Sequence, residues 1–271
     1  MKNLFIIWTA VLISTVAHGQ LPDPHDQTRL IVKNNVKSVK AYSCDTTTKE
    51  YYCLQYVYDK KGNKIQEIQC QPNRADTFFY HFDSLGNKTL CTYSNGQIES
   101  KYLNTYNKQK QLIKSVWEFK SEPREYDRIE TKCYYDNKGR LSKTHEKSYS
   151  KENKLIFDEI STLYYNNSNQ LRLAVFGTDS LKNSTEYFFY DDNGLLVKEV
   201  TNGTHFYNGS NPRDRILIFH YDNNGFLISW ETNETIGNSM TTITQTVDKN
   251  GLIQNIGGQT CYEYEYFSTD K

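Results

Sequence analysis

Six aspartates stand three residues before a glycine, and carboxylates repeated in this way could bind calcium. They are Asp59, Asp83, Asp136, Asp191, Asp222 and Asp248. Calcium needs about six to eight oxygen ligands converging on one ion, whereas each copy supplies one carboxylate. An aspartate at the start of a turn can instead accept hydrogen bonds from backbone N–H groups two residues on. We therefore expect these residues to cap turns, and we expect no metal site and no cofactor.

The histidines and the known catalytic motifs give no positive sign of an active site. The five histidines beyond residue 20 lack the H-E-x-x-H spacing of a zinc site; they are His25, His81, His145, His205 and His220. His81 and His220 both stand two residues before a repeat aspartate, which makes them residues of a sheet face. The chain also lacks G-x-S-x-G, Walker and G-x-G-x-x-G motifs. A Cys–His nucleophile pair stays open, but we predict a protein that is not an enzyme.

The cysteines offer redox chemistry. Their number is even, and a secreted chain with six cysteines permits 15 disulfide connectivities; the residues are Cys44, Cys53, Cys70, Cys91, Cys133 and Cys261. Cys53 and Cys70 would lie nearly opposite each other across one hairpin, and Cys44 and Cys53 across another, but both bonds cannot form together. We favour disulfides near the N-terminal end, with small buried thiols as the alternative.

The first residues have the pattern of a secretory signal peptide over residues 1–19. Lys2 is followed by the apolar run 4–16 and by Ala17-His18-Gly19, with small residues where cleavage requires them. The apolar run is too short to span a membrane. No cysteine follows it, so we expect no lipoprotein anchor. The predicted location is secreted or periplasmic.

Each repeat aspartate belongs to a longer pattern that predicts a β-hairpin. Aromatic residues precede the aspartate, two mostly polar residues follow it, and glycine then supplies the positive φ of a type I turn with a G1 bulge. Asparagine replaces aspartate in two weaker copies, where Lys110 and Asn169 stand in place of glycine. The eight turns start at residues 59, 83, 107, 136, 166, 191, 222 and 248.

Such a turn pairs the residue before the aspartate with the residue five after it. Six copies place an aromatic or valine side chain opposite leucine or isoleucine, which is a favourable cross-strand pair. The pairs are Tyr106–Leu112, Tyr135–Leu141, Tyr165–Leu171, Tyr190–Leu196, Tyr221–Leu227 and Val247–Ile253. The first two copies differ, because Lys64 and Lys88 stand opposite Tyr58 and Phe82.

The predicted fold is all-β: tandem antiparallel β-hairpins forming an extended, twisted or spiral sheet, like a solenoid, because neighbouring hairpins bury a shared face. We expect an N-terminal cap over residues 20–50, hairpin repeats over 51–258 and a closing strand over 259–271, with no linker between them. Residues 36–42 alternate as a strand should. Tyr262, Tyr264 and Tyr266 alternate with glutamates, which is typical of a protected edge strand.

Charge and aromatic content narrow the classes of partner. Lysine plus arginine and aspartate plus glutamate are equal at 32 each, so bulk charge favours neither nucleic acid nor an anionic membrane. No run beyond residue 20 is long and apolar enough to span a membrane. The 22 tyrosines are the unusual feature. Six of them could bind a partner or could form the internal ladder of the sheet: Tyr58, Tyr106, Tyr135, Tyr165, Tyr190 and Tyr221.

The segments 188–196 and 219–227 resemble the YD repeats of bacterial RHS proteins and of animal teneurins, and the likeness covers residues 51–255. The resemblance implies spiralling hairpin sheets. Large members form shells around a toxic C-terminal domain, and some are linked to carbohydrate binding or cell contact. Eight copies are too few for a large shell, and the segment preceding the toxin in that family is not found here. We therefore expect a short, free-standing member rather than a toxin-delivery protein.

The expected function is that of a binding or scaffolding module for a protein or carbohydrate partner in the envelope or outside the cell. Three alternatives stay open: an immunity or inhibitor protein, a toxin-associated factor, and an unrecognised hydrolase that uses residues scattered over the repeats.

Overall fold

The computed structural model describes residues 28–44, 53–71, 74–120, 127–178, 182–203, 215–234 and 239–268. The predicted signal peptide lies outside these residues, as do residues 20–27 and 45–50 of the predicted cap. The contacts divide the chain into two units. Among the described residues, unit 1 lies within 100–188 and 202–203, and unit 2 lies within 28–99, 189–201 and 215–268.

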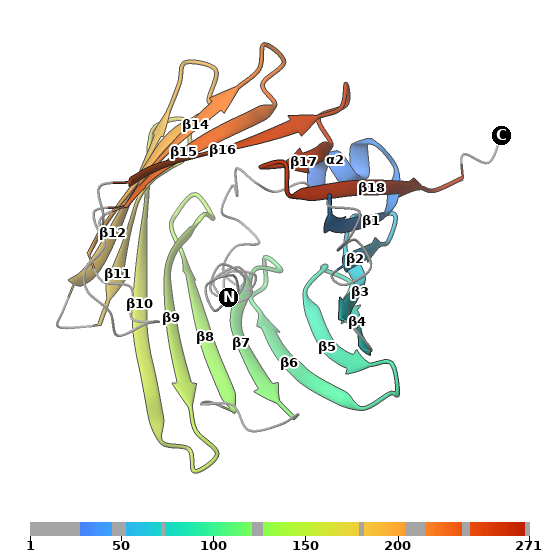
Figure 1. Cartoon of the computed structure of the whole chain (residues 1–271). Coiled ribbons are helices and arrows are strands. Elements are labelled where there is room, and N and C mark those ends of the chain that lie inside the picture. Colours follow the sequence, from blue (N-terminus) through green and yellow to red (C-terminus); the bar gives the residue numbers. More distant parts are fainter. Residues whose placement is uncertain are drawn as a thin grey trace. The chain divides into compact units, whose positions relative to one another are not determined.

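Unit 1 is a run of antiparallel strands in which each strand pairs with the next along the chain (Figure 1). The strands are β6 (Ile98–Tyr106), β7 (Leu112–Phe119), β8 (Arg128–Tyr135), β9 (Leu141–Tyr149), β10 (Leu155–Tyr165), β11 (Leu171–Gly177) and β12 (Lys182–Tyr190). The ends of β6 and β12 reach into the sequence of unit 2.

Unit 2 combines the first and the last strands of the chain with one short helix, α2 (Thr28–Lys33). Its N-terminal strands are β1 (Val36–Ser43), β2 (Cys53–Tyr58), β3 (Lys64–Gln71), β4 (Arg74–Phe82) and β5 (Lys88–Tyr93). Its C-terminal strands are β13 (Leu196–Gly203), β14 (Arg215–Tyr221), β15 (Leu227–Glu234), β16 (Ser239–Val247), β17 (Ile253–Ile256) and β18 (Thr260–Tyr266).

The first and last strands correct the predicted fold class. β18 pairs with β17 on one side and with β1 on the other, and β1 also pairs with β2. All 18 strands are assigned to one antiparallel sheet that includes the β1–β18 pairing. The expectation of an open, spiral or solenoid-like sheet with residues 259–271 as an edge strand is therefore wrong. The predicted strand over residues 36–42 is confirmed as β1.

The reason for the β1–β18 pairing lies in two alternating patterns that complement each other. Val39 is paired with Tyr264, and Ala41 with Tyr262, so each aliphatic residue of β1 faces an aromatic residue of β18. Such pairs stabilise adjacent strands. The backbone groups of the last strand are also satisfied by this pairing instead of being left at an edge. Alternation alone predicts a half-buried strand, but it does not say which strand lies beside it.

The turn geometry that the sequence predicts is confirmed at all eight positions. In each copy the first residue accepts a hydrogen bond from the N–H group three residues on and donates its own N–H to the carbonyl four residues on; at Asp59 these distances are 3.0 and 2.9 Å. Asp59 Oδ1 also accepts from the N–H groups of Lys61 and Asn63 at 2.9 Å. Lys110 and Asn169 adopt φ values of 63° and 64°, as their place in the turn requires.

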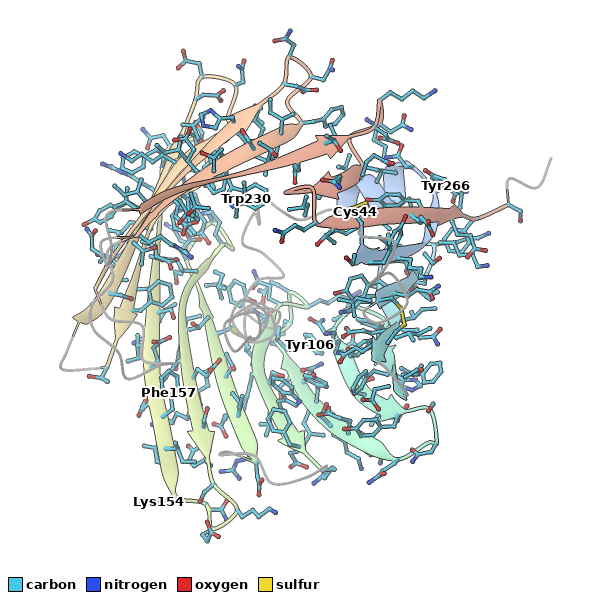
Figure 2. The ribbon with its side chains drawn as sticks, in the orientation of Figure 1. Cys44, Tyr106, Lys154, Phe157, Trp230 and Tyr266 are labelled. Atoms are coloured by element: carbon cyan, nitrogen blue, oxygen red, sulfur yellow. A yellow bond between two sulfur atoms is a disulfide. The ribbon has the colours of Figure 1, made fainter. Side chains whose placement is uncertain are left out.

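Two further turns of the same kind were missed because they lack the aspartate. They run from Tyr93 to Gly96 and from Ser150 to Asn153, with φ values of 82° and 58° at their fourth residues. Lys154 in Figure 2 follows the second of these turns and accepts a hydrogen bond from the N–H of Ser150. Positive φ at the fourth residue is therefore a stricter requirement of this turn than an aspartate or asparagine at its first residue.

Five of the six predicted cross-strand pairs are confirmed, and Tyr190–Leu196 stays a prediction. Tyr106–Leu112, Tyr135–Leu141, Tyr165–Leu171, Tyr221–Leu227 and Val247–Ile253 are directly opposite each other, each beside a shift in register. The two predicted exceptions, Tyr58–Lys64 and Phe82–Lys88, are paired in the same way. The turn therefore fixes the register whatever side chain stands opposite the aromatic residue.

Each unit has its own apolar cluster. In unit 1, Tyr135, Tyr165, Phe176 and Phe188 pack against the buried residues Cys133, Leu141, Leu163, Leu171 and Ala174. In unit 2, Tyr58, Tyr262 and Tyr264 pack against Ile31 of α2 together with Val36, Val39 and Leu252. Among the described residues, no helix combines the length and apolar composition needed to cross a membrane.

Candidate functional site

The repeat tyrosines form a ladder of hydrogen bonds between neighbouring hairpins. Tyr135 Oη donates to the carbonyl of Leu112 at 2.9 Å, and Tyr165 Oη to that of Leu141 at 2.7 Å. In unit 2, Tyr221 Oη donates to the carbonyl of Leu196 at 2.7 Å. Leu112 and Leu141 are the residues that stand opposite the tyrosine of the preceding repeat, and Leu196 holds the equivalent sequence position. Each hydroxyl therefore ties one hairpin to the next.

The closing strand continues this ladder, although its sequence lacks the turn motif. Tyr264 Oη donates to the carbonyl of Ile253 at 2.6 Å. Burial raises the pKa of Tyr264 and raises the pKa of both Tyr135 and Tyr221 to about 12. These phenols stay neutral donors at physiological pH. We define the sheet face that carries Tyr135 and Tyr165 as the ladder face of unit 1.

The structure places the other three nominated tyrosines at the same position of their own repeats. Tyr58 packs on the core of unit 2, Tyr106 is opposite Leu112 at the end of β6 (Figure 2), and Tyr190 directly precedes the turn at Asp191. The nominated set thus shares one position relative to the turn, and described contacts with hairpin neighbours account for the hydroxyls of Tyr135, Tyr165 and Tyr221.

The residues next to the ladder tyrosines are the ones that sequence reasoning missed. Tyr134 and Tyr164 immediately precede Tyr135 and Tyr165, so strand alternation points them to the opposite face, which we call the reverse face of unit 1. Their exposed fractions are 45% and 50%. Sequence alternation already contained the signal, because two adjacent tyrosines in one strand cannot both join the ladder.

The two lysines that break the pairing rule lie in a polar cluster of unit 2. Lys64 Nζ donates to Glu67 Oε2 at 2.6 Å and lies 4.5 Å from the centroid of the Tyr56 ring. Lys88 Nζ lies 4.6 Å from the centroid of the Tyr80 ring. Tyr80 Oη in turn donates to Glu67 Oε2 at 3.1 Å. The lysines replace the leucine of other repeats because ring faces and a carboxylate surround them.

The electrostatics of this cluster define what it can do. Burial pushes the pKa of Glu67 upward, but the charge of Lys64 and the hydrogen bonds from Lys64, Gln69 and Tyr80 outweigh it and lower that pKa. Burial, with the nearby charge of Lys64, lowers the pKa of Lys88 to about 8. Glu67 is therefore held as a carboxylate with its oxygens occupied by donors, an arrangement that suits an ion-pair network rather than a general acid.

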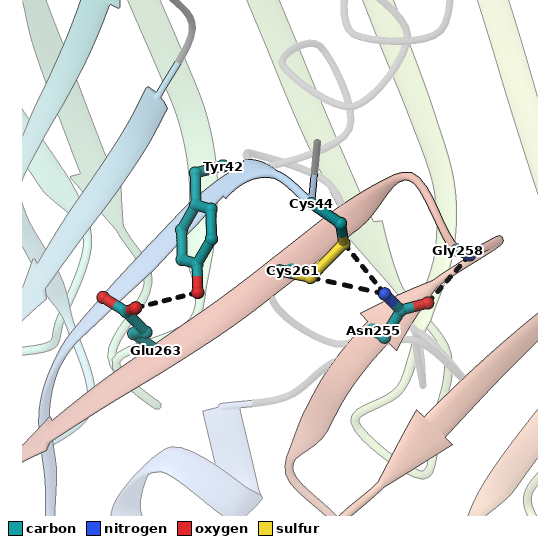
Figure 3. The surroundings of a disulfide bond; sticks show 6 residues. All are labelled: Tyr42, Cys44, Asn255, Gly258, Cys261 and Glu263. Carbon is teal, nitrogen blue, oxygen red and sulfur yellow. Dashed lines mark hydrogen bonds between the residues drawn. A yellow bond between two sulfur atoms is a disulfide. The ribbon is translucent and has the colours of Figure 1, made fainter. Parts of the chain in front are cut away.

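The six cysteines fall into two disulfides and two buried thiols. Cys53–Cys70 joins the two strands of the first hairpin, where the register places the two residues opposite each other. Cys44 bonds to Cys261 and not to Cys53. In Figure 3, Asn255 Nδ2 donates to Cys44 Sγ at 2.9 Å and Asn255 Oδ1 accepts from the N–H of Gly258 at 2.8 Å. The sulfur pair thus links β18 to the end of β1. Two disulfides are compatible with an exported protein.

The two free cysteines are unsuited to nucleophilic catalysis. Burial raises the pKa of Cys91 to about 12 and that of Cys133 to about 11. The thiolate is the nucleophile, so a raised pKa makes both groups unreactive near neutral pH.

Two of the described histidines lie beside carboxylates. His145 Nε2 lies 2.6 Å from Asp158 Oδ1, and His220 Nε2 lies 3.2 Å from Glu231 Oε1. His81 is paired with Leu90 across β4 and β5. His25 and His205 lie outside the described residues. Within the described ranges, histidine, cysteine, aspartate and glutamate nowhere form a group of three that could hold a metal ion.

Comparisons with known proteins give only weak likenesses. No family model matches the chain, and no curated protein matches it. The crystal structure of TcdB2-TccC3-Cdc42 aligns with 74% of this chain at 12% identity and a TM-score of 0.36, and the chain spans 12% of that chain's length.

Two porin-like proteins also align with this chain. The one from Bacteroides uniformis covers 85% of this chain and 98% of its own, at 10% identity and a TM-score of 0.44. The one from Bacteroides vulgatus covers 86% of this chain and 98% of its own, at 9% identity and a TM-score of 0.44. These are weak, fold-level similarities, and no family is established by them.

Proposed function

We propose that this protein is an exported, non-enzymatic binding module that contacts its partner through the reverse face of unit 1. The observation that carries the proposal is the contrast between adjacent tyrosines. The hydroxyls of Tyr135 and Tyr165 donate hydrogen bonds to the neighbouring hairpin. Tyr134 and Tyr164 are about half exposed, and their hydroxyls are not needed for the hairpin contacts. Tyrosine provides broad contact area at low cost in conformational entropy, which is why binding surfaces use it.

The location assumed in this proposal is secreted or periplasmic, with residues 1–19 acting as a signal peptide and without a lipid anchor. An oxidising compartment would preserve Cys44–Cys261 and Cys53–Cys70. Direct sequencing of the N-terminus of the exported protein tests this part. A mature chain beginning near Gln20 is expected, and retention of Met1 in the exported protein would contradict it.

The partner-binding part is tested with a panel of immobilised glycans and envelope proteins. The folded protein is expected to bind at least one member, and Tyr134→Ala/Tyr164→Ala is expected to abolish that binding. Tyr266→Ala serves as the control, because Tyr266 is exposed to a similar extent in unit 2. Absence of binding to the whole panel, or equal binding by the Tyr134→Ala/Tyr164→Ala variant, would contradict the proposal.

A further inference from the structure

Two lysines stand directly opposite each other on the reverse face of unit 1, and a histidine is the next residue of the same row. Lys114 of β7 is paired with Lys132 of β8, and Lys132 is paired with His145 of β9. Like charges in directly opposed positions destabilise a sheet. Lys132 is exposed between its two neighbours. The charge that points to a role outside the sheet is that of Lys132, the exposed middle member of the row.

The carboxylates that could neutralise the row lie on one side of it. Glu130 is 3.2 Å from Lys114, and Asp158 is shared by His145 at 2.6 Å and Lys147 at 3.1 Å. Glu130 precedes Lys132 by two residues along β8, whereas Tyr134 follows it by two. Negative charge is therefore concentrated on the side of the row away from the exposed tyrosines.

On the tyrosine side, a second lysine stands between the two exposed rings. Lys143 is directly opposite Tyr134, and its Nζ lies 5.8 Å from the centroid of that ring. Its partner on the other side is Thr162, two residues before Tyr164 in β10. Tyr134 and Tyr164 are two strands apart and offset by two residues along the strand, which corresponds to about 12 Å at the usual spacings. We call Lys132, Tyr134, Lys143 and Tyr164 the Lys–Tyr strip.

The chemistry of the strip selects its ligand. Ammonium groups form strong charge-assisted hydrogen bonds with carboxylates, and flat tyrosine rings offer faces on which the C–H groups of a sugar ring can stack. The strip is only about two rows of side chains wide, whereas a stable interface with a globular protein needs about 800 Å² on each partner. A narrow strip that crosses three strands fits a linear polymer.

We propose that the Lys–Tyr strip binds an acidic polysaccharide, with sugar rings stacked on Tyr134 and Tyr164 and sugar carboxylates paired with Lys132 and Lys143. This inference rests on the proposed function and gives it a substrate class. The ligand supplies the negative charge that the tyrosine side of the strip lacks. It would also relieve the repulsion between Lys114 and Lys132, which stand directly opposite each other.

The test is calorimetric titration of the full chain with three probes: hexameric oligogalacturonate, maltohexaose and a short polyglutamate. Oligogalacturonate is expected to bind, and its affinity is expected to fall as salt rises, because exposed charge pairs are screened. Maltohexaose lacks the carboxylates and polyglutamate lacks the sugar rings. The affinity of each is expected to be at least about tenfold lower than that of oligogalacturonate, which corresponds to the loss of one charge-assisted contact.

Matched variants separate the strip from the rest of the surface. Lys132→Gln/Lys143→Gln and Tyr134→Ala/Tyr164→Ala are each expected to weaken oligogalacturonate binding at least about tenfold. Lys151→Gln removes an exposed lysine at the β9–β10 turn, and Tyr266→Ala removes an exposed tyrosine of unit 2. Both controls are expected to bind as the wild type does. The thermal unfolding curve of every variant shows whether it is folded.

The outcomes distinguish this inference from the proposed function. Equal binding of maltohexaose would overturn the acidic specificity, and equal binding of polyglutamate would overturn the sugar class. Binding of oligogalacturonate that the strip variants leave unchanged, or no binding of it at all, would overturn the site. In each of these cases the proposed function stands or falls separately on the panel experiment with the Tyr134→Ala/Tyr164→Ala variant.

Discussion

In unit 1 the ladder face carries an apolar cluster, with Leu141, Leu163 and Leu171 buried around Tyr135 and Tyr165. The first two hairpins of unit 2 instead carry Lys64 and Lys88 where other repeats have leucine. Both disulfides lie in unit 2, and the described part of unit 1 has none. The same turn therefore supports two kinds of stabilisation. One depends on apolar cross-strand pairs, and the other depends on ion pairs and covalent links.

The largest expected effect is the loss of the Cys44–Cys261 disulfide. The bond closes a loop with a sequence separation of 217 residues, against 17 for Cys53–Cys70. Chain entropy predicts a cost of about 5 kcal/mol for Cys44→Ser/Cys261→Ser and about 3 kcal/mol for Cys53→Ser/Cys70→Ser. Urea unfolding measures the difference. A smaller effect for the first variant than for the second would show that closure of the loop is not what this bond contributes.

Hydrogen exchange refines the same comparison. The Cys44→Ser/Cys261→Ser variant is expected to exchange faster in β1 and β18, which the bond joins. Exchange in β8–β11 is expected to change least, because those strands belong to unit 1. Equal acceleration in both sets of strands would mean that the units do not respond separately.

The next largest effect concerns the apolar ladder of unit 1. Leu171 is buried in the cluster with Leu141 and Leu163, so Leu171→Ala removes packed methyl groups and leaves a cavity. A loss of about 3 kcal/mol is expected in the free energy of unfolding. Leu103→Ala is the control, since Leu103 is 56% exposed and should lose less than about 0.5 kcal/mol. Similar losses in both variants would contradict the assignment of the ladder face as the core.

A smaller effect separates two neighbouring tyrosines. Tyr165→Phe deletes the hydrogen bond to the carbonyl of Leu141 and is expected to cost about 1 kcal/mol. Tyr164→Phe is expected to leave stability unchanged, because Tyr164 is exposed on the reverse face. The difference between the two thermal unfolding curves is the measurement. A larger loss for Tyr164→Phe would reverse the assignment of faces.

A further expected effect is a pH dependence in the polar cluster of unit 2. Lys88 has a pKa of about 8 in the folded protein against an ordinary value of 10.5. Between these pH values the unfolded chain binds more protons than the folded one, so stability rises with pH across this window. Below about pH 8, the cost of burying the charged Lys88 side chain is fully present. The free-energy difference between wild type and Lys88→Met, followed from pH 7 to about 10.5, should change in that direction. A constant difference would contradict the burial of Lys88.

Local chemistry is what the sequence could predict. Asp59, Gly62 and their equivalents specify a turn within a few residues, and the turn fixes pairs such as Tyr135–Leu141. The pairing of β1 with β18 could not be predicted, because it joins segments separated by most of the chain and alternation does not name a partner. Cys44–Cys261 follows from that pairing and was hidden for the same reason.

The candidate site shows the same division. The nominated tyrosines carried the repeat signal because they make the ladder, and a residue selected for packing between hairpins is poorly placed to bind a partner. Tyr134 and Tyr164 carry no repeat signal of their own. Only the assignment of faces, with Lys132 and Lys143 beside them, brings them together as one surface.

The most direct test of this account is the chemical accessibility of adjacent tyrosines in the folded protein. Nitration with tetranitromethane, followed by peptide mass spectrometry, reports each tyrosine separately. Tyr134 and Tyr164 are expected to react early, while Tyr135 and Tyr165 are protected by the ladder until the protein unfolds. Equal reaction of Tyr135 and Tyr134, or protection of Tyr134 and Tyr164, would contradict the separation of a structural ladder face from a binding face.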